Sequence, residues 1–140
     1  MSQHQPEFPE EFEAARNNAK VGTVLVSQSA RNRVWYLHLR PGERIGYHCH
    51  VLDYFWTCLT HGRAQSRING TAPTARDYAP GDTAHMSYGK GECMVHDLEN
   101  IGGTDLVFIT VENLDSANDP LPLPDGVEPT GVIPDRITVE

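Results

Sequence analysis

The sequence predicts an all-β domain, an antiparallel sandwich or barrel. Short runs rich in β-branched and aromatic residues recur along the middle of the chain, and turn signals separate them. The expected strands lie at 21–27, 34–39, 47–59, 83–88, 94–98 and 106–112, the third interrupted at 51–53 by a hairpin bend or a bulge. Glycine, proline and asparagine mark turns at 40–43, 60–62, 69–70 and 79–82.

Two segments of different composition flank this domain, which we place at residues 21–113. Residues 1–20 carry two prolines and an acidic patch at 10–16, which predicts a short helix or an arm. Residues 114–140 hold five of the ten prolines of the chain, and proline is excluded from the interior of a sheet. Apolar residues such as Leu121 and Val127 predict that this tail lies extended over the domain or over a partner subunit.

Charge and composition exclude several classes of function. The 140-residue chain has a formal net charge of −8 and no cluster of lysine and arginine, so we expect neither nucleic acid nor a membrane as a partner. No apolar run is long enough to span a membrane, and the acidic N-terminus does not resemble a secretory signal. Three cysteines without a CxxC motif predict free thiols in a reducing cytoplasm.

Two histidines in one expected strand indicate a metal site. His48 and His50 follow a turn at Pro41-Gly42, and alternate side chains of a strand lie on the same face. A third histidine, His96, lies in a later expected strand. Imidazole binds divalent transition metals, so we predict these three residues as ligands of Fe, Zn, Ni, Mn or Cu.

The spacing around these histidines resembles the two motifs of the cupin superfamily. The residues that carry the resemblance are Gly42, His48, His50 and Gly62 for the first motif, and Pro80, Gly81, Asp82, His96 and Asn100 for the second. The resemblance covers residues 34–112. It implies a cupin-like antiparallel jelly-roll β-barrel, with an N-terminal arm and a proline-rich C-terminal extension added to it, and a metal inside the barrel.

The chain departs from the family pattern at two places. The first cupin motif usually has a glutamate four or five residues after its second histidine, where this chain has Tyr54 and Phe55. The interval between Gly81 and His96 is also longer than in the common pattern. The remaining ligand set is similar to the three-histidine variant of cupin sites, which some iron-dependent dioxygenases use.

Four further residues are candidates for the site. Tyr54 stands in place of the missing glutamate, and its phenol could hydrogen-bond to a metal-bound water or to a substrate. Asp53 and Glu92 are candidates for a carboxylate ligand or an acid-base group. His85 is a candidate acid-base group as well, although a histidine satisfied within the fold is the simpler interpretation.

These features predict a small metal-dependent enzyme that acts on a small oxygen-rich organic metabolite. Three histidines leave metal positions open for substrate and dioxygen, which favours an Fe(II) dioxygenase. Two alternatives stay open: a metal-assisted isomerase, lyase or decarboxylase, and a non-catalytic protein that binds a metabolite or a metal. Oxygen consumption distinguishes the first alternative from the dioxygenase. We expect a cytoplasmic homodimer, because arms or partner strands often cover sheet edges in such domains.

Overall fold

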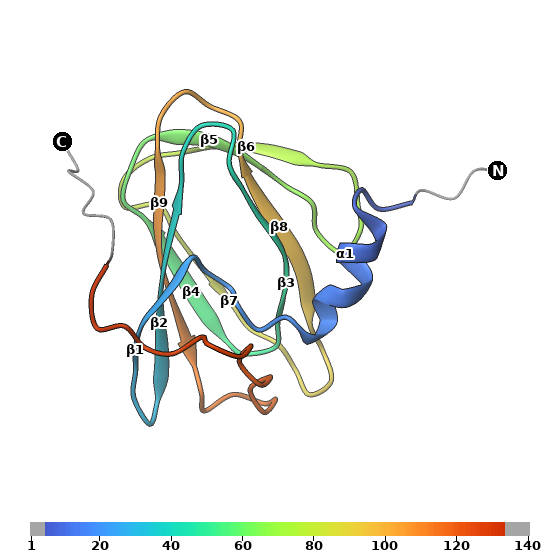
Figure 1. The fold of residues 1–140 in the computed structure, drawn as a ribbon, viewed down its shortest axis with the longest axis vertical. Coiled ribbons are helices and arrows are strands. Elements are labelled where there is room, and N and C mark those ends of the chain that lie inside the picture. The colour runs from blue at the N-terminus through green and yellow to red at the C-terminus, as the bar shows by residue number, and fades with distance from the viewer. Residues whose placement is uncertain (1–4, 134–140) are drawn as a thin grey trace.

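The computed structural model, which describes residues 5–133, consists of two antiparallel β-sheets that face each other (Figure 1). The strands are β1 (Val24–Gln28), β2 (Asn32–Leu39), β3 (Arg44–His50), β4 (Tyr54–Cys58), β5 (Gly62–Ser66), β6 (Thr74–Tyr78), β7 (Thr83–Met86), β8 (Met94–Asn100) and β9 (Leu106–Asn113). One sheet has the order β1-β2-β9-β4-β7 and the other β3-β8-β5-β6. The predicted all-β class is confirmed. Within the described range the two sheets do not close into one hydrogen-bonded barrel.

Two strands, β5 and β6, lie between residues 60 and 82, where we expected turns but no strand. Their residues are mostly polar, and β6 is an edge strand with its first four residues exposed. Strand propensity and apolar alternation identify half-buried strands, and both are weak in such segments. The expected strand at 47–59 is divided at 51–53, but its halves do not form a hairpin, because β3 and β4 belong to different sheets.

The main core fills the space between the sheets at one end. Its buried members come from β2, β4, β5 and β9, and they are Leu37, Leu39, Cys58, Ala64, Leu106 and Phe108. Burying a large apolar side chain contributes about 1.5–3 kcal/mol. The backbone of β5 approaches this core closely at Gly62, where an added Cβ would lie 2.5 Å from Leu106 Cδ2. The glycine therefore permits the contact between β5 and β9.

A short helix covers one sheet from outside (Figure 1). Helix α1 (Pro9–Ala14) continues into the 3-10 turn η1 (Ala15–Asn17), and both lie against β3. Phe12 packs edge-on against Tyr47 with ring centroids 5.2 Å apart. No helix in the described part of the chain is long and apolar enough to cross a membrane.

The proline-rich segment lies on its own domain. Residues 114–133 form no strand. Leu123 and Val127 pack against a buried cluster that includes Leu25, and the Thr130 N–H donates a hydrogen bond to the Leu25 carbonyl oxygen at 3.0 Å. The remaining residues of the predicted tail, 134–140, lie outside the described residues. The homodimer stays a prediction.

Candidate metal centre

Three histidines converge between the sheets. His48 and His96 are cross-strand partners on β3 and β8, and His50 is the next inward-facing residue of β3. Pairs of their ring centroids are 4.7–5.0 Å apart, and the Nε2 atoms of His50 and His96 are 3.0 Å apart. One nitrogen from each ring lies within 4.8 Å of the other two. The fold therefore brings the three predicted ligands together.

A β-bulge in β3 orients two of these histidines. Ile45 pairs with Leu98 and His48 pairs with His96, so β3 has one residue more than β8 in this interval. The extra residue lets both Ile45 and His48 face the interior, which regular alternation would not allow. Glu11 of helix α1 accepts a hydrogen bond from the Tyr47 N–H within the bulge, at 3.0 Å. The helix thus supports the backbone irregularity that directs the histidines inward.

The three imidazoles are neutral near pH 7. Burial lowers the pKa of His48 to about 4, even though its Nδ1 hydrogen-bonds to the Gly46 carbonyl oxygen at 2.9 Å. Burial also holds the pKa values of His50 and His96 well below the usual 6.5, and repulsion from neighbouring imidazoles adds to this effect. A carbonyl only accepts, so the proton of His48 lies on Nδ1 and the Nε2 lone pair is free.

This donor set fits a divalent transition metal. Neutral imidazole is a strong ligand for such ions. Two nitrogens bound at a right angle to one ion, with bonds of about 2.1 Å, lie about 3.0 Å apart. That separation agrees with the 3.0 Å between the Nε2 atoms of His50 and His96. In the described part of the chain, no carboxylate or thiol joins the three histidines.

Tyr54 lies directly beside the histidine cluster. Its ring stacks on the imidazole of His50, with centroids 4.0 Å apart and an interplanar angle of 13°. The Tyr88 ring is nearly parallel to it at 6.3 Å, and neither buried hydroxyl makes a hydrogen bond of normal geometry to another described residue. Burial raises the pKa of Tyr54 far above its usual value and that of Tyr88 to about 12. Both phenols therefore remain protonated and can donate hydrogen bonds.

The other three candidates lie away from the cluster. Asp53 accepts a hydrogen bond from the Tyr88 N–H at 3.0 Å, and Glu92 accepts one from the Gly89 N–H, so both carboxylates stabilise the backbone of nearby loops. His85 is exposed, on the face of β7 that points away from the three histidines. The structure therefore does not place Asp53, Glu92 or His85 among the ligands.

A cavity of about 210 Å³ opens above the histidines. Both sheets contribute to its lining, which is mainly apolar and aromatic. Besides the histidines and Tyr54, its walls include Leu37, Trp56, Tyr78, Met94, Leu98 and Phe108. A metal held by the three histidines would therefore face a space that admits a small molecule.

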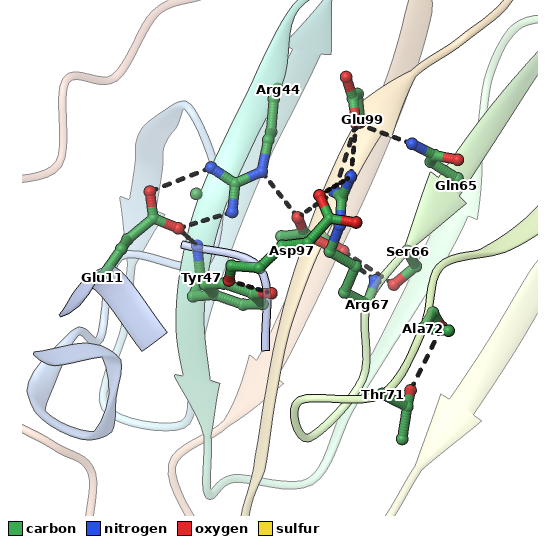
Figure 2. A network of polar contacts seen from close by, with 12 residues as sticks. Glu11, Arg44, Tyr47, Gln65, Ser66, Arg67, Thr71, Ala72, Asp97 and Glu99 are labelled. Atoms are coloured by element: carbon green, nitrogen blue, oxygen red, sulfur yellow. Dashed lines mark hydrogen bonds and ion pairs between the residues drawn. The ribbon is translucent and has the colours of Figure 1, made fainter. Parts of the chain in front are cut away.

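An ion network on the other face of β3 and β8 supports the site, and the sequence analysis did not identify it (Figure 2). Asp97 follows His96 and is fully buried. Its carboxylate accepts hydrogen bonds from Arg44 Nε at 2.7 Å and from Arg67 Nη1 at 2.8 Å. Arg44 also donates to both carboxylate oxygens of Glu11. The sequence does contain a signal for this network. Asp97 is a charged residue in the middle of an expected strand, on the face opposite to the predicted ligand His96.

Comparisons with known proteins identify the fold. No family model and no curated protein matches the chain. A cupin domain from Bordetella pertussis Tohama I matches with a TM-score of 0.56 and 21% identity, covering 64% of this chain and 88% of that one. A protein with a double-stranded β-helix domain from Klebsiella pneumoniae matches with a TM-score of 0.51 and 26% identity, covering 64% and 68%. An RmlC-like cupin from Methanocaldococcus jannaschii matches with a TM-score of 0.53 and 14% identity, covering 64% and 76%.

These likenesses show that the chain has the cupin fold, the double-stranded β-helix. The fold predicted from the histidine motifs is thereby confirmed. Because one such scaffold supports many different reactions, the function has to be argued from the site itself.

Proposed function

We propose that this protein is a metal-dependent enzyme that acts on a small organic substrate, with His48, His50 and His96 as the metal ligands. The observation that carries the proposal is the convergence of three neutral, largely buried imidazoles in the wall of a cavity. A divalent metal held there would act as a Lewis acid and, as Fe(II), would also permit oxygen chemistry. Iron is the metal we propose first, and Zn, Ni, Mn and Cu are the alternatives.

The side chains around the site favour a reaction in which the protein transfers few protons. An isomerase, lyase or decarboxylase needs a group that accepts or donates a proton. Glu92 and His85 lie away from the cavity, and the raised pKa of Tyr54 prevents its phenol from acting as a base near neutral pH. This supports an Fe(II) dioxygenase over those alternatives. In this proposal Tyr54 donates a hydrogen bond to an oxygen atom of the substrate.

Metal binding is the first test. Elemental analysis of untagged protein from its native host should find close to one equivalent of iron, whereas zinc or nickel in its place would count against oxygen chemistry. In anaerobic titrations with Fe(II), we expect His48→Ala, His50→Ala and His96→Ala each to weaken binding by about 100-fold or more. The control His85→Ala, at an exposed histidine, should bind as the unmodified protein does. Unchanged binding in all three ligand variants would disprove the proposed centre.

Oxygen consumption is the second test. The Fe(II)-loaded protein is incubated with an ultrafiltered metabolite extract, while an oxygen electrode and mass spectrometry follow the mixture. A dioxygenase consumes oxygen in proportion to the compound that disappears. A compound that disappears without oxygen consumption would instead establish the isomerase, lyase or decarboxylase. A compound that binds and is recovered unchanged would establish a non-catalytic binding protein.

A further inference from the structure

Three aromatic rings form one side of the cavity. Trp56, Tyr78 and Phe108 come from β4, β6 and β9, and thus from both sheets. Each ring meets the other two edge to face, with centroids 5.1–5.6 Å apart and interplanar angles of 69–88°. Aromatic walls of this kind pack well against a flat apolar ligand.

Arg76 provides the one formal charge in this lining, as far as the chain is described. Its guanidinium lies 5.2 Å from the ring centroid of Trp56 and 4.9 Å from that of Tyr78. Arg44, Arg63 and Arg67 all pair with carboxylates, but no carboxylate in the described part of the chain pairs with Arg76. An exposed guanidinium without an acidic partner, held beside an aromatic wall, is available to bind the carboxylate of a ligand.

The size of the cavity limits the ligand. A cavity of about 150 Å³ with apolar walls accepts benzene. The 210 Å³ found here therefore holds one ring with small substituents. A larger polycyclic molecule would have to extend into solvent.

We infer that the cavity binds a flat, single-ring carboxylate, whose carboxylate pairs with Arg76 and whose other end faces the three histidines. The inference rests on the proposed function for the end that faces the metal. This ligand differs from the oxygen-rich metabolite expected from the sequence, because it has an apolar body and polar atoms at its two ends.

Three small probes test the two parts of this ligand separately. Benzoate has the ring and the charge, benzamide has the ring without the charge, and acetate has the charge without the ring. Calorimetry on metal-free and metal-loaded protein should show that benzoate binds about tenfold or more tightly than either of the others. Arg76→Gln should bring benzoate and benzamide to within about twofold of each other. Arg63→Gln, an exposed arginine on the neighbouring strand, is the control and should leave the preference unchanged.

Each result decides one part of the inference. Equal binding of benzoate and benzamide, or equal effects of Arg76→Gln and Arg63→Gln, would overturn the role of Arg76. Acetate binding as tightly as benzoate would overturn the aromatic body, and no saturable binding of benzoate up to about 10 mM would overturn the site as a whole. If Arg76→Gln does not fold, Arg76→Lys takes its place, and it should retain part of the preference for benzoate.

Benzoate binding to metal-free protein distinguishes this inference from the proposed function. If the protein binds benzoate with the expected preference but takes up no metal, the inference holds and the proposed enzyme is wrong. If metal binds as proposed but benzoate does not bind, the enzyme proposal stands and the ligand class is wrong.

Discussion

Replacing Asp97 with asparagine should destabilise the protein strongly, because this carboxylate is the buried centre of the ion network. Its side chain is 0% exposed, and its partners Arg67 and Arg44 are only 5% and 17% exposed. Asparagine has nearly the same shape but no charge. Its amide nitrogen would face either the Arg67 backbone N–H or the guanidinium groups of Arg44 and Arg67, so in both orientations one donor would meet another.

The expected loss of stability is about 3 kcal/mol. Removing one member of a buried ion pair costs about 3–5 kcal/mol, since the other charge stays buried without its partner. The lower end applies here, because Glu11 still pairs with Arg44, and Glu7 and Glu99 still pair with Arg67. For a chain of this length, about 3 kcal/mol corresponds to a fall in melting temperature of about 10 °C.

Equilibrium unfolding followed by circular dichroism measures this loss. Asp77→Asn is the matched control, because Asp77 also pairs with an arginine, Arg63, but their side chains are 77% and 50% exposed. Exposed pairs contribute little, so the control should lose less than about 0.5 kcal/mol. If the two variants lose the same amount of stability, the buried network does not stabilise the fold and the reasoning is wrong.

Two further substitutions test the packing and the buried charge of the fold. Gly62→Ala places a methyl group 2.5 Å from Leu106 Cδ2, so unfolding experiments should show a loss of about 1–3 kcal/mol, whereas Gly103→Ala, with no atom within 4 Å, should change stability by less than about 0.5 kcal/mol. Burial raises the pKa of Glu112, which accepts a hydrogen bond from Trp35 Nε1 at 2.7 Å. Below the pKa of the unfolded state, near 4.5, Glu112 is protonated in both states and its contribution to stability is fully present. As the pH rises through the higher pKa of the folded state, the carboxylate ionises and this contribution is lost. Glu112→Gln keeps an acceptor and carries no charge, so its melting temperature should exceed that of the unmodified protein increasingly between about pH 4 and pH 8; a difference independent of pH would contradict this.

The fold and the three histidines could be predicted because their signals are local. His48 and His50 alternate on one strand, and the adjacent proline and glycine at Pro80-Gly81 mark a turn. Such patterns depend on backbone periodicity, which the sequence displays directly. The cupin resemblance then joined His96 to them, although nearly fifty residues separate it from the other two ligands.

The remaining parts of the site depend on contacts between distant segments. The bulge at Tyr47 is held by Glu11, and Arg76 reaches the cavity from a polar edge strand that has no apolar alternation. Asp53 and Glu92 were reasonable ligand candidates by their distance from the histidines in sequence, but both form hydrogen bonds to loop backbone instead. Sequence proximity does not determine which way a loop carboxylate turns, because that depends on which backbone N–H groups the fold leaves without a partner.

The hydrogen bond from the Tyr47 N–H to Glu11 has a consequence for how the domain can be divided. A chain shortened to begin at residue 21, where the strand pattern starts, would lose Glu11 together with the rest of helix α1. The bulge N–H would then lack its acceptor, Arg44 would lose one of its two carboxylates, and the ring of Tyr47 would lose its contact with Phe12. The smallest unit that keeps the histidines correctly oriented therefore includes the N-terminal helix, and an N-terminal fusion partner is best attached through a linker that leaves this helix free to dock.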